Sequence, residues 1–195
     1  DEMLRELRAI RMLLERQQRG TMPTPQVPPT PVNATVSLGS GAALGQSNAP
    51  LIMVEFTDYQ CSFCKKFHDA VFPELKKNYI DTGKVRMIYR PVYFDGPGLW
   101  ADMMARCGGP EKYFGIVSLL YEQHGNWARG ATGAEVAQSL VTLGKLAGMT
   151  EDDITACMQD RDFAGALIAD FQTNMERDNV QGTPTFFING ELLSN

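Results

Sequence analysis

The sequence predicts an α/β fold that carries a helical insertion, and the order of its strand and helix patterns supports this prediction. Leu51–Thr57 reads LIMVEFT, a short apolar run typical of a buried strand, and residues 84–89 alternate like a second strand. The pattern from about residue 97 to residue 179 is helical, and Thr185–Ile188 predicts a third strand. Strands that alternate with helices favour an α/β architecture, and the long helical block is the insertion.

Residues 1–19 come before this domain and predict an amphipathic helix. Their apolar side chains follow the 4-3-4 spacing of a heptad seam at Met3, Leu7, Ile10 and Leu14. A lone helix of this length is marginal in water, so it must pack on its own domain or on copies of itself, or else fray. We favour self-association, which makes a homo-oligomer through residues 1–19 the leading expectation.

Residues 20–34 predict a linker between this helix and the globular domain at residues 35–195. The linker holds five of the eleven prolines, a composition that favours polyproline II and acts as a semi-rigid spacer. Early in the domain, the glycine-rich segment 39–45 looks like a phosphate-binding loop. Because Leu44 stands where that motif needs its third glycine, we interpret the segment as a plain loop.

The remaining elements follow from breaks and caps along the domain. Residues 61–80 predict a helix that Pro73 should kink. Thr150, followed by three acids, is a plausible N-cap within the helical block, and Asn189-Gly190 predicts a hairpin turn after the third strand. The helices of the block are expected at residues 99–107, 111–124, 134–146, 151–159 and 163–178.

The composition excludes several classes of protein. Of the 195 residues, 44% are hydrophobic and 21% charged, which is ordinary for a globular domain. The net charge of −5 and the lack of a long basic block argue against nucleic-acid binding. No apolar run approaches the roughly 18 residues that span a bilayer. The opening DEMLRELRAI is no signal peptide, but a segment removed before residue 1 would leave no trace, so a cytosolic location does not follow.

Two of the four cysteines, Cys61 and Cys64, form a C-x-x-C at the junction between a predicted strand and a predicted helix. A helix N-terminus offers free N–H groups and the positive end of the dipole, which stabilise a thiolate. Cys61 is therefore the expected nucleophile, and Cys64 the shielded resolving thiol that displaces a mixed disulfide. The alternatives are a static disulfide and a metal half-site with His68. A closed zinc site needs a fourth ligand and no second C-x-x-C exists, so we predict no metal and no cofactor.

Two further features accompany the cysteine pair. Glu55 is an acid inside the apolar run, and we expect it to lie beneath the pair and shuttle a proton for Cys64. The alternative is an outward-facing acid on an edge strand. Thr183-Pro184 stands at the mouth of the third strand, where a cis bond would offer backbone groups to a substrate strand. Alone, this dipeptide is weak evidence, because most X–Pro bonds are trans.

These segments, VEFTDYQCSFCKKFHDAVFPELKKNYIDTGKVRMIYR and VQGTPTFFING, resemble the DsbA family of thiol–disulfide oxidoreductases over roughly residues 51–190. The resemblance implies a thioredoxin-like fold with a helical domain inserted after the second strand. It assigns Cys61 as the nucleophile, Cys64 as the resolving cysteine, Glu55 as the buried acid and Thr183-Pro184 as the cis-proline loop. The substrate-binding residues expected from it are Ser62, Phe63, Thr183 and Pro184.

The resemblance also implies a structural bond and partners. Relatives often carry cysteines at the positions of Cys107 and Cys157, which favours a disulfide across the helical insertion; the alternative is two buried free thiols. The expected partners are unfolded or partly folded secreted proteins and a membrane redox partner of the DsbB or vitamin-K-epoxide-reductase type. The expected location is periplasmic or otherwise extracytoplasmic. A dithiol oxidase is the leading function, with an oligomeric isomerase or reductase, or a redox-inactive chaperone or binding module, as alternatives.

The sequence departs from the family pattern in three places. The dipeptide Ser62-Phe63 lacks the histidine of the strongly oxidising members, so we expect a reduction potential between about −270 and −120 mV. The helix and spacer at residues 1–34 are absent from the simplest monomeric members. The family's final strand and C-terminal helix are expected beyond Asn195, where this sequence stops.

The roles of the two histidines and of four aromatic residues stay open. His68, one turn beyond Cys64, either tunes the cysteines or only packs, and we favour packing or solvation. His124, beside Gly125, is expected at a helix end against the C-terminal dipole. An apolar surface for substrates is expected to draw on Phe63, Phe67, Tyr59 and Trp100, although at this spacing some of them belong to the core.

Overall fold

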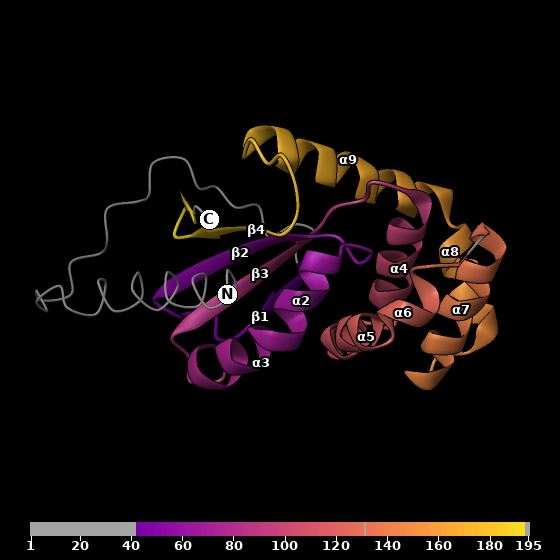
Figure 1. Cartoon of the computed structure of the whole chain (residues 1–195), viewed down its shortest axis with the longest axis horizontal. Coiled ribbons are helices and arrows are strands. Elements are labelled where there is room, and N and C mark those ends of the chain that lie inside the picture. The colour runs from indigo at the N-terminus through magenta and orange to yellow at the C-terminus, as the bar shows by residue number, and fades with distance from the viewer. Residues whose placement is uncertain (1–41, 131, 194–195) are drawn as a thin grey trace, which may run out of the picture.

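A computed structural model describes residues 42–130 and 132–193 and arranges their strands in one mixed sheet (Figure 1). The central strands β2 and β3 run parallel, and the outer strands pair antiparallel with their neighbours in the order β1-β3-β2-β4-β5. The strands are β1 (Ala42–Leu44), β2 (Leu51–Thr57), β3 (Val85–Pro91), β4 (Thr185–Ile188) and β5 (Glu191–Leu192). The three predicted strands are confirmed. The expectation that a further strand lies only beyond Asn195 is wrong, because β5 follows the predicted Asn189-Gly190 turn and pairs with β4.

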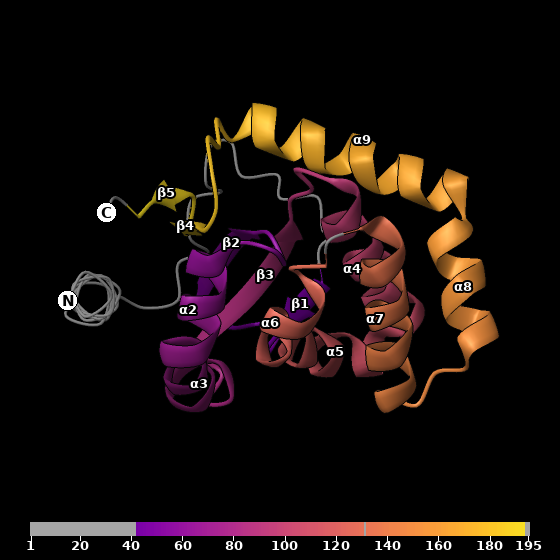
Figure 2. The ribbon, with the colours of Figure 1, turned by 45° about the vertical axis from the view of Figure 1, so that its right-hand side comes forward.

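Two groups of helices join these strands. Between β2 and β3 lie α2 (Ser62–Ala70), α3 (Phe72–Leu75) and the π-helical turn η1 (Lys76–Ile80). Between β3 and β4 lie α4 (Gly96–Cys107), α5 (Pro110–Glu122), α6 (His124–Trp127), α7 (Gly133–Leu146), α8 (Glu151–Gln159) and α9 (Arg161–Arg177). Figure 2 shows the second group, α4 to α8, gathered beyond one end of the sheet, with α9 running back toward β4. The predicted all-helical insertion after the second strand is therefore confirmed.

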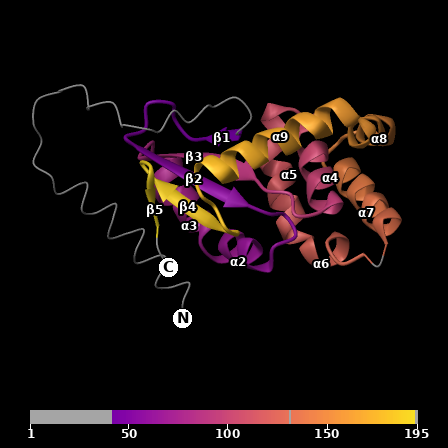
Figure 3. The ribbon, with the colours of Figure 1, turned by 90° about the horizontal axis from the view of Figure 1, so that it is seen from above.

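The two faces of the sheet are covered by different helices (Figures 1 and 3). Side chains alternate between faces along a strand. On β2, Met53 belongs to the main core with residues of α2, α3 and α5, whereas Val54 and Phe56 pack in a second cluster with residues of α9. Glu55 lies on the same face of β2 as Met53, so its side chain points toward the main core.

The helix predicted over residues 61–80 is interrupted. It begins at Ser62, breaks at Val71, and continues as α3 and η1. Pro73 lies in the first turn of α3, where its missing N–H costs no helical hydrogen bond. The predicted kink is confirmed, and its position two residues before the proline follows from that preference.

The interpretation of residues 39–45 as a plain loop is wrong for Ala42–Leu44, which form the edge strand β1. This strand pairs antiparallel with β3, with Ala42 opposite Tyr89. Three residues are too few to show an alternating pattern, so this strand could not be predicted from local periodicity. Gly45 ends the strand with φ +100°, and a Cβ there would lie 2.6 Å from the Val85 carbonyl oxygen.

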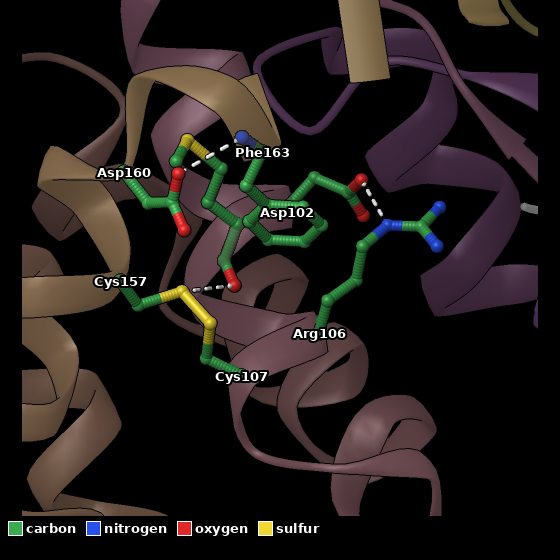
Figure 4. The surroundings of a disulfide bond; sticks show 7 residues. Asp102, Arg106, Cys107, Cys157, Asp160 and Phe163 are labelled. Atoms are coloured by element: carbon green, nitrogen blue, oxygen red, sulfur yellow. Dashed lines mark hydrogen bonds and ion pairs between the residues drawn. A yellow bond between two sulfur atoms is a disulfide. The ribbon is translucent and has the colours of Figure 1, made fainter. Parts of the chain in front are cut away.

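A disulfide joins Cys107, the last residue of α4, to Cys157 of α8, with 6.3 Å between their Cα atoms (Figure 4). The predicted bond across the insertion is present, and the alternative of two free thiols is wrong. Thr150 caps α8 by accepting from the Asp153 N–H, as predicted.

Several expectations concern segments that the structure does not describe. The predicted helix at residues 1–19 and the linker at residues 20–34 lie outside the described residues. None of the helices within 42–130 and 132–193 is long and apolar enough to cross a membrane.

Candidate functional site

The two cysteines of the C-x-x-C stand at the start of α2 in very different surroundings. Cys61 is the N-cap of the helix, and its Sγ accepts from the Cys64 backbone N–H over 3.4 Å. Cys61 is partly exposed, whereas Cys64 is fully buried, with 0% of its surface exposed. Both are free thiols, so the structure holds the dithiol form of the pair.

This placement separates the acidities of the two thiols. The Cys64 side chain, the Thr183 side chain and the backbone of Cys64 and Phe63 hydrogen-bond to Cys61 and lower its pKa to about 5, against the opposing effect of burial. Burial, together with the hydrogen bond to Cys61 and the Glu55 carboxylate, holds the pKa of Cys64 far above its ordinary range. One thiol is therefore ionised at neutral pH and the other is protonated.

The loop before β4 lies against the nucleophile. The Thr183–Pro184 peptide bond is cis, as the sequence suggested. Cys61 Sγ lies 3.4 Å from the Thr183 carbonyl oxygen, to which it donates only while it is protonated, across 122 residues of sequence. Thr185 Oγ1 donates to the Gly182 carbonyl and closes the turn. The structure thus brings together the cysteine pair and the proline loop that the sequence predicted separately.

Glu55 lies in the middle of the sheet, and its charge acts on Cys64. The register pairs Glu55 with Tyr89 of β3 on one side and Phe186 of β4 on the other, and 0% of Glu55 is exposed. The alternative of an outward-facing edge acid is therefore wrong. Within residues 42–130 and 132–193, neither carboxylate oxygen of Glu55 has a hydrogen-bond partner.

A chain of polar side chains runs beside Glu55. His68 Nε2 lies 3.6 Å from Glu55 Oε1 and 2.8 Å from the Tyr89 hydroxyl. Tyr89 donates to the Tyr121 hydroxyl over 3.3 Å, and Tyr121 hydrogen-bonds to Thr57 Oγ1 over 2.8 Å. The imidazole of His68 stacks on Tyr121 with 4.1 Å between ring centroids. His68 is buried, so the solvated alternative is wrong, and it packs while keeping a polar contact beneath the cysteines.

A second buried polar cluster surrounds Asp102 of α4. The acid accepts from Tyr59 over 2.8 Å and Tyr113 over 2.9 Å at Oδ1, and from Tyr93 and Arg106 at Oδ2 (Figure 4 shows the Arg106 contact). Tyr59 stands two residues before Cys61, so this cluster ties the cysteine loop to the inserted helices. Asp102 and Arg106 are an i,i+4 pair on α4, but the three tyrosines come from other segments, so local patterns do not predict the cluster.

The rim of the site contains an acid that sequence reasoning missed. Burial raises the pKa of Asp58 to about 6, and its charge opposes ionisation of Cys61. The Asp58 carbonyl accepts from the Cys61 N–H over 3.1 Å. His124 is not at a helix C-terminus as expected: it begins α6, is buried, and its Nε2 contacts the Gln60 carbonyl over 2.9 Å. The helix predicted over residues 111–124 ends at Glu122, which frees His124 for this contact.

The expected apolar surface is smaller than the sequence suggested. Phe63 is 63% exposed beside the cysteines, and Ser62 is exposed next to it. Tyr59 and Phe67 are buried core residues, and Trp100 is half-buried. In the part of the chain that the structure describes, no group of three histidine, cysteine or acidic residues is placed to hold a metal ion.

The comparisons agree with this geometry. Residues 37–195 match the family model described as thioredoxin. The chain belongs to the thioredoxin family. A putative protein-disulfide oxidoreductase of Rickettsia prowazekii is 29% identical over 172 residues, which are 88% of this chain and 62% of that protein. Disulfide bond formation protein D of Bacillus subtilis is 28% identical over 175 residues, which cover 84% of this chain and 74% of that protein.

A solved structure extends the likeness to three dimensions. The crystal structure of Wolbachia pipientis alpha-DsbA1 superposes with a TM-score of 0.71 at 28% identity, covering 77% of this chain and 75% of that one. The resemblance to the DsbA family is therefore confirmed, as is the thioredoxin-like fold with its helical insertion. The chain spans 62% of the length of the Rickettsia prowazekii relative.

Proposed function

We propose that this protein exchanges disulfides with protein substrates through Cys61 and Cys64, acting as a dithiol oxidase. The observation that carries the proposal is the asymmetry of the pair. Cys61 is partly exposed at a helix start with its pKa lowered to about 5, while Cys64 is fully buried. A reactive sulfur that substrate can reach, backed by one that it cannot, is the arrangement that a dithiol exchange requires.

The proposed reaction begins with the oxidised pair. A substrate thiolate attacks Cys61 Sγ, the Cys61–Cys64 bond breaks, and its electron pair goes to Cys64 Sγ, which takes a proton from Glu55. A second substrate thiolate then attacks the substrate sulfur of the mixed disulfide, and Cys61 leaves as a thiolate. The substrate gains a disulfide and loses two electrons, which reduce the protein pair. The low pKa of Cys61 makes it a good leaving group in the second step.

The surroundings of Cys61 supply the proposed substrate contacts. Ser62 and Phe63 are exposed in the active dipeptide, and Thr183 and Pro184 lie across from them in the loop that touches Cys61 Sγ. An extended, unfolded substrate segment would lay its backbone along Thr183 and an apolar side chain on Phe63. Such contacts do not depend on one sequence, which suits unfolded or partly folded secreted proteins.

Repeated turnover needs a partner that removes the two electrons. We propose a membrane oxidant of the DsbB or vitamin-K-epoxide-reductase type, and a periplasmic or otherwise extracytoplasmic location. Self-association through residues 1–19 would instead suit an isomerase, since several linked Cys61 sites can hold one substrate during shuffling.

The first experiment is equilibration of the pair against glutathione to obtain its reduction potential, with oxidation of a reduced dithiol peptide as the activity. We expect a potential toward the −120 mV end of the range from thioredoxin to DsbA, and stoichiometric oxidation of the peptide. A potential near −270 mV would replace the oxidase with a reductase or isomerase. If Cys61→Ser, shown to be folded by circular dichroism, still oxidises the peptide, the cysteine mechanism is wrong. If a variant that lacks both Cys61 and Cys64 still suppresses the aggregation of an unfolded protein, the chaperone alternative is favoured.

A further inference from the structure

The resolving cysteine creates a problem that the pair alone cannot solve. When substrate opens the oxidised pair, Cys64 leaves as a thiolate in a site with 0% exposure, and burial holds its pKa far above the ordinary range. The leaving sulfur therefore needs a proton as the bond breaks. Glu55, whose charge acts directly on Cys64, is the acid beneath it.

When Glu55 gives up that proton, it becomes a buried carboxylate that needs a hydrogen-bond donor. The carboxylate that remains is fully buried, and neither of its oxygens has a hydrogen-bond partner within the described ranges 42–130 and 132–193. A buried carboxylate without a donor is costly. The proton transfer thus requires a nearby N–H or O–H group that turns to Glu55 after the transfer.

His68 is the group whose geometry fits this need. Its Nε2 lies 3.6 Å from Glu55 Oε1, about 0.7 Å beyond an ordinary N–H···O bond. His68 follows Cys64 by four residues, on the same buried face of α2, so one turn of helix fixes the two side chains relative to each other. Stacking on Tyr121 and packing against Phe72, with ring centroids 4.8 Å apart, hold the imidazole in place.

The direction of the neighbouring hydrogen bonds places the imidazole proton. Tyr89 donates its O–H to Tyr121, and Tyr121 donates to the Asp58 carbonyl oxygen over 3.3 Å. With its own proton committed, the Tyr89 oxygen acts as an acceptor toward His68 Nε2, 2.8 Å away. We therefore assign the His68 proton to Nε2, the nitrogen that also lies 3.6 Å from Glu55 Oε1.

Building on the proposed function, we propose that His68 is the positioning residue for Glu55: its Nε2–H turns from the Tyr89 oxygen to the Glu55 carboxylate as Glu55 gives its proton to Cys64. The Glu55 O–H bond breaks and the Cys64 S–H bond forms, while the His68 N–H bond stays intact and only exchanges its acceptor. The groups that face His68 are Glu55 from β2, Tyr89 from β3, Tyr121 from α5 and Cys64 from its own helix.

The test measures how fast glutathione opens the oxidised Cys61–Cys64 pair, by acid quench and mass spectrometry. His68→Phe keeps a stacking ring but removes the donor, and His68→Gln keeps an N–H group near the Nε2 position. We expect His68→Phe to slow opening about tenfold, equal to about 1.4 kcal/mol, and His68→Gln to stay within about threefold of wild type. Absorbance of the Cys61 thiolate at about 240 nm should titrate alike in all three reduced proteins, because His68 does not contact Cys61.

A double-mutant cycle separates this role from a structural one. Glu55→Gln cannot donate the proton, so adding His68→Phe to it should cost nothing further. An equal slowing by His68→Phe with and without Glu55, a failure of His68→Gln to restore the rate, or an unchanged rate in His68→Phe would each overturn the inference. If glutathione does not open the wild-type pair at all, the proposed function fails instead, and the two failures are distinguishable.

Discussion

Acidification should remove the stabilisation that the Cys61 thiolate gives to the reduced protein. The pKa of Cys61 is about 5 in the folded protein, whereas an unfolded cysteine titrates near about 8.5. The folded value is the lower one, so the stabilisation is fully present above about pH 8.5 and is lost as the pH falls through 5. Without solvent screening, this difference in pKa would lower the free energy of unfolding by about 3.5 kcal/mol between pH 8 and pH 5. Cys61 is partly exposed, and solvent screening reduces the expected change to about 2 kcal/mol.

The assay is urea unfolding of the reduced protein at half-unit steps between pH 5 and pH 8, for wild type and for Cys61→Ser. Asp58 contributes with the opposite sign, because its raised pKa of about 6 makes ionisation less favourable in the folded state. Both proteins contain Asp58, so the difference between their unfolding free energies reports Cys61 together with its coupling to Asp58. A difference that stays flat within about 0.5 kcal/mol over this range would refute the assignment of a stabilised Cys61 thiolate.

Three further predictions address the surroundings of the pair. Asp58→Asn removes a charge that opposes the thiolate, so the Cys61 absorbance titration should move to lower pH; an unmoved midpoint would contradict this. Asp102→Ala leaves a buried cluster without its acceptor and should cost about 3–5 kcal/mol in urea unfolding, and a loss below about 1 kcal/mol would show that the cluster is dispensable. Cys107→Ala with Cys157→Ala opens a 50-residue separation and should cost about 4 kcal/mol, without moving the Cys61 titration.

Local patterns along the chain predicted the parts of the site that depend on neighbouring residues. The apolar run LIMVEFT predicts a buried strand with Glu55 inside it, and Glu55 is fully buried in β2. The strand-to-helix junction at Cys61 predicts an N-cap thiol, and Cys61 is the N-cap of α2. Both predictions succeed because the period of a strand and the free N–H groups of a helix start are set by a few consecutive residues.

Contacts between segments that are distant in the sequence could not be predicted from such local patterns. His68 meets Tyr89 across 21 residues and Thr57 meets Tyr121 across 64, so no periodicity links them. Burial of a histidine or tyrosine is decided by what packs over it, and here that is the inserted helix α5. The same holds for β1, whose three residues become a strand only because β3 offers a free edge.

The two buried acids of the core show how one fold treats the same chemical group in two ways. Asp102 receives donors at both oxygens, from Tyr59 and Tyr113 at one and from Tyr93 and Arg106 at the other, so its charge is fully compensated. Glu55 receives none within the described part of the chain and has His68 Nε2 standing just beyond hydrogen-bond distance. Asp102 therefore serves as a fixed anchor between the cysteine loop and the inserted helices. Glu55, which lacks such donors among the described residues, is the acid whose charge acts on Cys64, and the proposed proton transfer takes place there.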